Sequence, residues 1–128
     1  TVLAGIPESL PALVKAYRIQ DKVANVGFDW EKREDVWTKV KEEIAEFEVE
    51  VDHMDEAKAT EEMGDLIFAL VNAARLYNIR PDNALEKTNA KFIKRFNYIE
   101  QKAKEKGQSL NDMTLDEMEA LWQEAKKA

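Results

Sequence analysis

The sequence contains no cysteine, which excludes disulfide bonds, thiolate metal sites and cysteine nucleophiles. This absence is typical of a cytoplasmic protein, and we expect one. The only histidine, His53, falls in a predicted turn and is expected to be solvated. Without a second histidine, histidine-based zinc sites and the paired Glu-x-x-His motifs of di-iron four-helix proteins are excluded, and a Ser-His-Asp triad is not expected.

Long apolar runs are also missing. None approaches the roughly 20 residues that a membrane-spanning helix needs, and no signal peptide is visible. The formal net charge of −7 argues against nucleic acid or an acidic membrane as a partner. Because no Gly-rich phosphate loop is present either, an anionic substrate would need a local basic patch or a metal bridge.

The sequence is rich in helical periodicity, and four glycines and three prolines leave room for long helices. Its 128 residues fit one all-α domain, 1–128, with residues 1–8 as a leader. Ser9 is a candidate N-cap and Gly27 a candidate stop for the first helix. Phe28 and Trp30 are expected to plug the core. Later helices are predicted over about 31–52, 56–77 and 81–106, and a last short one follows the Thr114/Glu117 capping box.

The third predicted helix is apolar over most of its circumference. Its apolar positions are Met63, Leu66, Ile67, Leu70, Val71, Ala74 and Tyr77, with Phe68 and Leu76 outside that stripe. Such a helix is normally enclosed on several sides. In a chain this small a second subunit would supply the cover, so we expect a homodimer.

Two acidic pairs, Glu43/Glu46 and Glu62/Asp65, flank the predicted turn at Met54. Each has i,i+3 spacing, so its members share a helix face. In an antiparallel hairpin the four carboxylates would lie at matching heights along the two helices. Gly64, which has no side chain, would allow a close approach beside them. One such pair is weak support for a site, because surface helices are rich in Glu. Two matched pairs favour a bound hard cation, Mg²⁺ or Mn²⁺, that relieves their repulsion.

Basic and aromatic residues could serve an anionic nucleotide. Lys91, Lys94 and Arg95 could bind phosphate oxygens, although a solvated basic face explains them equally well. Trp30 and Trp122 could stack on a base, or each could belong to the core. Carboxylate-held metal together with Lys and Arg is typical of phosphoryl chemistry, in which a carboxylate accepts the proton of an attacking water.

Several segments together resemble the MazG nucleoside triphosphate pyrophosphohydrolases. The EExxE and ExxD signature of that family is similar to residues 39–46, KVKEEIAE, and 61–72, EEMGDLIFALVN. Further matches are LPAL at 10–13, AYRIQ at 16–20, VGFDW at 26–30 and NAKFIKRF at 89–96. The resemblance covers nearly the whole chain. It is strongest to the C-terminal of two tandem domains, so the chain is expected to be a piece of such a longer protein.

The resemblance implies an all-α bundle of four to five helices that dimerises and binds Mg²⁺. It implies hydrolysis of nucleoside triphosphates between the α and β phosphates, giving the monophosphate and pyrophosphate. The metal-ligand and catalytic roles fall to Glu43, Glu46, Glu62 and Asp65. The nucleotide contacts fall to Lys39, Val40, Lys41, Glu42, Glu43, Lys58, Ala59, Thr60, Glu61, Asp65, Lys91, Phe92, Ile93, Lys94, Arg95 and Trp122.

Two alternatives remain open at this point. The chain could be a helical interaction module that keeps the fold without activity, although the intact acidic set speaks against it. It could also be an enzyme of the same fold with a narrow substrate, such as a pyrimidine deoxynucleotide.

Overall fold

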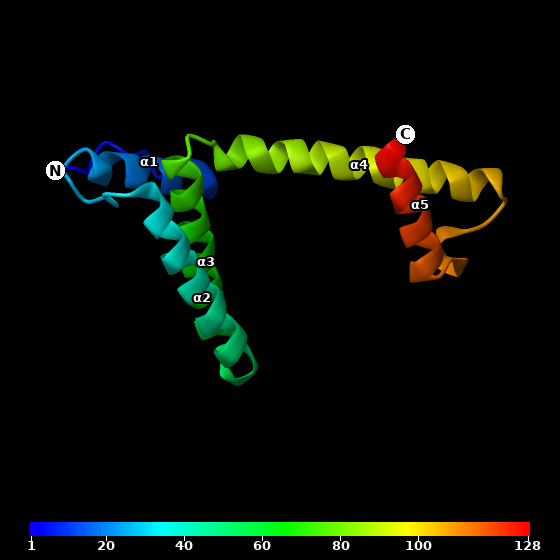
Figure 1. The fold of residues 1–128 in the computed structure, drawn as a ribbon, viewed down its shortest axis with the longest axis horizontal. Helices are drawn as coiled ribbons and strands as arrows, with labels where there is room; N and C mark the ends of the chain where they lie inside the picture. The colour runs from blue at the N-terminus through cyan, green and yellow to red at the C-terminus, as the bar shows by residue number, and fades with distance from the viewer. The chain divides into compact units, whose positions relative to one another are not determined.

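The computed structural model describes all residues 1–128 and contains only helices, turns and loops. The α-helices are α1 (Ala12–Ala24), α2 (Val36–Glu50), α3 (Glu56–Leu76), α4 (Pro81–Glu105) and α5 (Leu115–Lys127) (Figure 1). The expected all-α class is therefore confirmed, with five helices. None of them combines the length and the apolar character that crossing a membrane requires.

The chain divides into two compact units, Thr1–Ala84 and Leu85–Ala128, with the boundary in the first turns of α4. Each unit is described by itself below. The expectation that 1–128 works as one domain stays a prediction.

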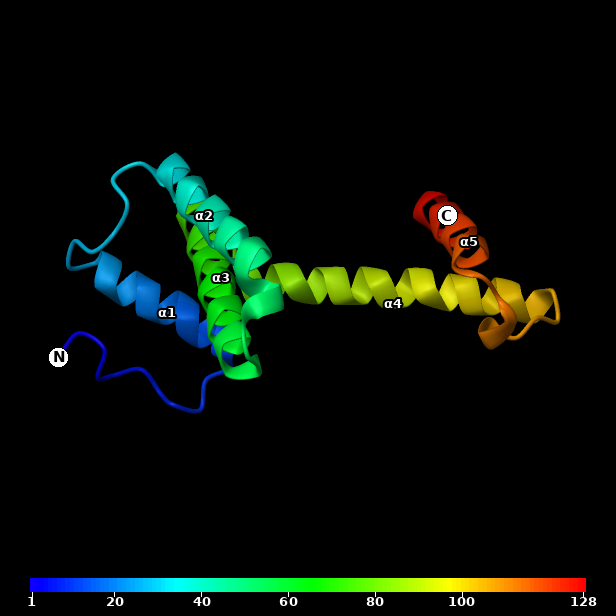
Figure 2. The same cartoon turned by 90° about the horizontal axis from the view of Figure 1, so that it is seen from below.

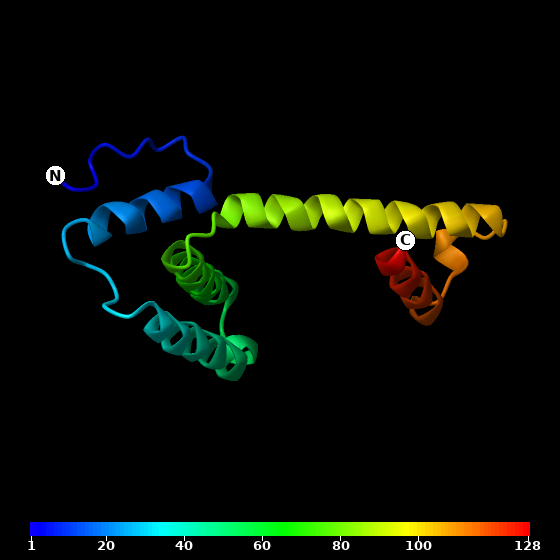
Figure 3. The same ribbon diagram turned by 45° about the horizontal axis from the view of Figure 1, so that its top comes forward.

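The first unit is built on an antiparallel hairpin of α2 and α3, which lie side by side in Figures 1 and 3. Val36 and Val40 of α2 pack against Ala69 and Ala73 of α3, and all four are buried. Alanine brings the two backbones close together, because its side chain is small. The hairpin turn is completed by Asp55, whose side chain accepts a hydrogen bond of 2.7 Å from the backbone N–H of Lys58 and so caps α3.

Helix α1 packs against α3 and is joined to α2 by an extended segment (Figure 2). It begins at Ala12 after Pro11, so the prediction that Ser9 caps it is wrong. The fixed φ of Pro11, −54°, already directs the chain into the helix. Helix α2 begins at Val36, about one turn later than predicted, because a 3₁₀ turn at Arg33–Asp35 precedes it.

The aromatic residues of this connection do not fill the core, which corrects the expectation for Phe28 and Trp30. Phe28 is 79% exposed and Trp30 39% exposed. The core of the hairpin is already filled by Val36, Val40 and the alanines of α3. The two aromatic side chains are therefore left on the surface of the first unit, beside the cleft described below.

The apolar stripe of α3 is only partly covered within the first unit. Val71 is buried, whereas Ile67 and Leu70 are each more than two-fifths exposed, as is Phe68 outside the stripe. The homodimer remains a prediction. The close approach expected at Gly64 is absent, because a Cβ added there would meet open space.

The second unit holds most of α4 together with α5. Ile99, Ala103 and Leu121 are its buried apolar residues. The predicted capping box is confirmed: Thr114 Oγ1 accepts from the backbone N–H of Glu117 at 3.1 Å, and the Glu117 carboxylate accepts from the backbone N–H of Thr114 at 3.2 Å. Gly107 ends α4 in the left-handed region with φ +65°, as its predicted role as a stop requires.

Candidate functional site

Three of the four predicted carboxylates meet on the facing flanks of α2 and α3. One oxygen from each of Glu43, Glu62 and Asp65 lies within 4.8 Å of the other two. Glu43 is buried, Glu62 is half-buried and Asp65 is exposed. The packing of Val40 against Ala69 sets the spacing of the helices, and the i,i+3 relation on α3 brings Glu62 and Asp65 to one face.

Glu46 is not part of this cluster, so the expectation that all four carboxylates converge is met by three. It is exposed and lines a neighbouring depression of about 510 Å³ with Glu62 and His53, at the turn end of the hairpin. A step of three residues moves a side chain about 4.5 Å along the helix axis, which carries Glu46 toward that end. His53 is exposed, as predicted.

Each helix supplies a lysine that already pairs with a carboxylate of the cluster. Lys39 Nζ lies 3.0 Å from Glu43 Oε1, and Lys58 Nζ lies 3.1 Å from Glu62 Oε1. These hydrogen bonds raise the pKa of both lysines above its ordinary value. Both lysines are predicted to contact the nucleotide, and that role stays a prediction. Through their ion pairs they reduce the repulsion within the cluster.

The donor set suits a hard divalent cation. It consists of carboxylate oxygens alone, without the sulfur or imidazole ligands that transition metals favour. Two oxygens at adjacent positions of Mg²⁺ are about 2.9 Å apart and two at opposite positions about 4.2 Å, given Mg–O distances of about 2.0–2.1 Å. The separations of up to 4.8 Å would therefore have to shorten on binding, and Asp65 is exposed enough to move.

The other nucleotide contacts predicted in the first unit have varied surroundings. Val40 is buried in the hairpin core. Lys41, Glu42 and Glu61 are exposed, and Ala59 is half-buried. The hydroxyl of Thr60 donates to the Glu56 carbonyl at 2.8 Å. The role of this set remains a prediction.

The basic residues predicted to contact the nucleotide belong to the second unit. Lys91, Lys94 and Arg95 line a small cleft of about 220 Å³ between α4 and the end of α5. The guanidinium of Arg95 lies over the Trp122 ring, 5.4 Å from its centroid, and the Phe92 ring lies 5.2 Å from Trp122. Ile93 is largely exposed. Arg95, Phe92 and Trp122 thus form one cluster within this unit.

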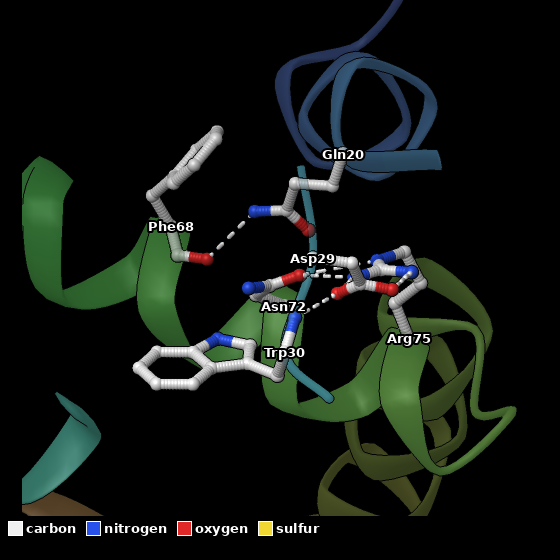
Figure 4. A network of polar contacts seen from close by, with 6 residues as sticks. All are labelled: Gln20, Asp29, Trp30, Phe68, Asn72 and Arg75. Carbon is white, nitrogen blue, oxygen red and sulfur yellow. Dashed lines mark hydrogen bonds and ion pairs between the residues drawn. The ribbon is translucent and has the colours of Figure 1, made fainter. Parts of the chain in front are cut away.

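A larger cleft of about 750 Å³ adjoins the acidic cluster in the first unit. Glu43 and Asp65 lie at its edge, and Gln20, Trp30 and Asn72 also line it. Asp29 and Arg75 line it too, and Arg75 Nη2 lies 2.6 Å from Asp29 Oδ1 and 2.9 Å from Asn72 Oδ1 (Figure 4). The hydrogen bond from Arg75 holds the pKa of Asp29 below its ordinary value.

Sequence reasoning missed this polar network. Its visible signal is Arg75, a charged residue inside the apolar run of α3 that is buried in the structure. A buried guanidinium needs a partner, and both Asp29 and Asn72 accept hydrogen bonds from it. The partner Asp29 comes from a loop 46 residues earlier, a separation that helical periodicity does not report.

Comparisons with known proteins agree with this architecture. The chain is 44% identical over 129 aligned positions to a nucleoside triphosphate pyrophosphohydrolase of Escherichia coli strain K12, covering 99% of this chain and 49% of that protein. It is 37% identical over 117 positions to a nucleoside triphosphate pyrophosphohydrolase/pyrophosphatase of Thermotoga maritima, covering 91% of this chain and 45% of that protein. The chain thus spans about half the length of these two curated relatives.

The family model of the MazG nucleotide pyrophosphohydrolase domain matches residues 32–99, which include α2, α3 and all members of the acidic cluster. This match covers more than half of the sequence, and so the chain belongs to the MazG nucleotide pyrophosphohydrolase family.

Proposed function

We propose that this chain is a Mg²⁺-dependent nucleoside triphosphate pyrophosphohydrolase. It cleaves ribo- or deoxyribonucleoside triphosphates between the α and β phosphates, giving the monophosphate and pyrophosphate. The observation that carries the proposal is the convergence of Glu43, Glu62 and Asp65 within 4.8 Å at the edge of a cleft. Membership of the MazG family and the pyrophosphohydrolase activity of the two relatives support it.

The residues that would hold the ion are Glu43, Glu62 and Asp65, with Glu46 as a fourth ligand. Glu46 lies on the same flank of α2 and is exposed, so its long side chain is free to turn toward Glu62. When bound, Mg²⁺ would neutralise phosphate charge and lower the pKa of a coordinated water. Mn²⁺ prefers the same oxygen ligands and would be a substitute.

The protein residues then divide the work. Glu43 or Glu46 accepts the proton as water attacks the α-phosphorus, and the bond to the bridging oxygen breaks so that pyrophosphate leaves. Lys39 and Lys58 orient Glu43 and Glu62 through their ion pairs. They also offset phosphate charge once a substrate is bound.

The second unit contributes phosphate contacts. Arg95, whose guanidinium lies over the Trp122 ring, and the neighbouring Lys91 and Lys94 form a basic cleft suited to phosphate oxygens. The proposed homodimer would cover the exposed apolar residues of α3, among them Ile67 and Leu70.

The deciding experiment incubates the protein with each common ribo- and deoxyribonucleoside triphosphate and Mg²⁺, and identifies the products. We expect pyrophosphate and the monophosphate, and no reaction in EDTA. Release of phosphate or triphosphate instead would contradict the assigned cleavage position. No turnover and no Mg²⁺-dependent thermal shift would favour an inactive interaction module, and turnover of pyrimidine deoxynucleotides alone would favour the narrow enzyme.

A further inference from the structure

Two ion pairs flank the acidic cluster of the first unit. Lys39 Nζ lies 3.0 Å from Glu43 Oε1 on α2, and Lys58 Nζ lies 3.1 Å from Glu62 Oε1 on α3. Each lysine precedes its glutamate by four residues, which is about 6 Å along the helix axis. Because α2 and α3 are antiparallel, Lys58 lies toward the turn of the hairpin and Lys39 lies away from it. The lysines therefore approach the carboxylates from opposite ends.

Helix stability does not explain these two pairs. At i,i+4 spacing, a Glu that precedes a Lys stabilises a helix better than the reverse order, and both pairs have the reverse order. Lys58 also lies in the first turn of α3, where the helix dipole disfavours a positive charge. The order of the residues thus indicates that the lysines act on the cluster rather than on their helices.

The two members of each pair differ in their freedom to move. The side chains of Glu43 and Glu62 are 9% and 17% exposed, whereas those of Lys39 and Lys58 are 49% and 53% exposed. Releasing a half-exposed ammonium group is easy, because water solvates it nearly as well as its partner does. A carboxylate that is mostly buried, in contrast, needs a positive partner. The carboxylates are therefore fixed, and the cations that pair with them are exchangeable.

Open space adjoins both lysines. Lys39 lines the larger cleft together with Glu43 and Asp65, and Lys58 lines the depression at the turn end together with Glu62. Each ammonium group can thus swing away from its carboxylate and still remain near the cluster. A divalent cation on these carboxylates would repel both ammonium groups, and an anionic chain beside that cation would attract them.

We propose that Lys39 and Lys58 exchange partners when the site is filled, each yielding its carboxylate to the divalent cation and turning to a phosphate. The inference rests on the proposed hydrolase function and names how its two ligands influence each other. By competing for the carboxylates, the lysines weaken the binding of the cation alone. By turning to the phosphates, they strengthen the binding of the triphosphate. Cation and triphosphate are thereby coupled, so that each favours the binding of the other.

The test measures the two affinities separately in Lys39→Met and Lys58→Met, which keep an unbranched side chain and remove its charge. Calorimetric titration gives the Kd of Mg²⁺ alone, with Mn²⁺ as a second probe. It also gives the Kd, at saturating Mg²⁺, of a nucleoside triphosphate whose α,β-bridging oxygen is replaced by a methylene group. In each variant we expect Mg²⁺ alone to bind about three- to tenfold more tightly and the analogue at least about tenfold more weakly.

The opposite signs identify the exchange. A lysine that only orients its glutamate would make Mg²⁺ bind more weakly in the variant, and one that only contacts phosphate would leave the Kd of Mg²⁺ unchanged. Either result overturns the proposal. Because the two lysines lie on different helices, one folded variant suffices for the test, and helical circular dichroism checks the folding.

Two further variants control for charge. Lys102→Met removes an ion pair of 3.4 Å with Glu105 in the second unit, where the carboxylate side chain is 52% exposed. It changes the net charge by the same amount and should leave both Kd values as in wild type. Lys58→Arg keeps a positive charge beside Glu62 and should not tighten Mg²⁺ binding. Tighter Mg²⁺ binding in either variant would overturn the proposal, since the effect would then not come from the charge beside the cluster.

The outcomes also separate the exchange from the hydrolase function. The Kd of Mg²⁺ is measured without nucleotide and without turnover, so an unchanged value in an active enzyme overturns the exchange and leaves the hydrolase function standing. If the two affinities shift in opposite directions but no triphosphate is hydrolysed, the exchange stands and the hydrolase function fails. If wild type binds neither Mg²⁺ nor Mn²⁺, both fail together.

Discussion

The two units of the chain differ in how they assemble charged groups. The first unit, Thr1–Ala84, brings short acidic side chains from two helices within 4.8 Å. The second unit, Leu85–Ala128, gathers long basic side chains, mostly along one helix, around a cleft of about 220 Å³. One arrangement suits a cation and the other an anion.

The comparison shows that the two kinds of site place different demands on the fold. Carboxylates from different helices repel, so they stay together only where buried packing fixes the backbones and nearby cations offset the charge. Val36 and Val40 provide the buried packing, and Lys39 and Lys58 provide the nearby positive charge. A basic cleft does not depend on the packing of two helices in this way. Helical spacing aligns Lys91 with Lys94 and Arg95, and the guanidinium of Arg95 lies over the Trp122 ring.

The largest expected effect comes from removing a carboxylate of the first unit. Glu62→Ala should lower kcat by at least about 100-fold, since the proposed metal ion, which would stabilise the charge developing on the phosphates, loses one of its ligands. Helical circular dichroism should be unchanged. Glu48→Ala, at an exposed position of α2 outside every cleft described here, is the matched control. Wild-type turnover in Glu62→Ala would contradict its assigned role.

A smaller effect is expected in the second unit. Arg95→Ala should raise KM for a triphosphate about 10–100-fold through the loss of a charge-assisted contact, and should change kcat less. Arg95→Lys should recover only part of the affinity, because an ammonium group lacks the planar, multi-donor guanidinium that lies over Trp122. Lys87→Ala, exposed on the same helix, is the control. An unchanged KM in Arg95→Ala would mean that the basic cleft is merely a solvated face.

Sequence alone predicts what local spacing determines. The bounds of α3 and α4, the capping box at Thr114 and the acidic flanks of the hairpin follow from periodicity and cap chemistry. The departure of Glu46 from the cluster does not follow, because it depends on the separation and relative height of two packed helices. Helical spacing on one helix carries no information about that height.

The polar network that lines the larger cleft could not be predicted from the sequence for a related reason. Gln20, Asp29 and Asn72 are each ordinary polar residues on helices or loops. Their importance arises only when α1 packs on α3 and buries Gln20, and when Asp29 reaches Arg75. Phe28 and Trp30 were expected in the core because of their apolar character, whereas the buried core of the hairpin consists of smaller residues.

The ion pair between Asp29 and Arg75 joins the α1–α2 connection to α3. Asp29→Asn should lower the free energy of unfolding at pH 7 by about 1–2 kcal/mol, less than for a fully buried pair because the Asp29 side chain is 26% exposed. The folded-state pKa of Asp29 lies below the ordinary 3.8, so this stabilisation is present above pH 3.8 and is lost as pH falls through the folded value.

Thermal unfolding of wild type and Asp29→Asn between pH 7 and pH 3 measures this difference. The gap in stability should narrow below about pH 4, since protonation then weakens the wild-type pair as well. Asp21→Asn, an exposed carboxylate on α1, controls for general charge effects. A gap that stays constant down to pH 3 would show that the carboxylate charge is not what Arg75 requires.

The smallest expected effect tests whether the two units are distinct in stability as well as in charge. Thr114→Ala removes the N-cap of α5 and should cost about 1 kcal/mol. If the units open separately, amide hydrogen exchange should accelerate in α5 and remain unchanged in α2 and α3. The expected acceleration is about fivefold, because a free-energy change of about 1.4 kcal/mol corresponds to a tenfold change in the opening equilibrium. Thr38→Ala makes the same replacement at an exposed position within α2, away from any cap, and serves as the control. Equal acceleration in all helices of Thr114→Ala would mean that the chain opens as one cooperative body, and the acidic and basic clefts would then depend on a single folding transition.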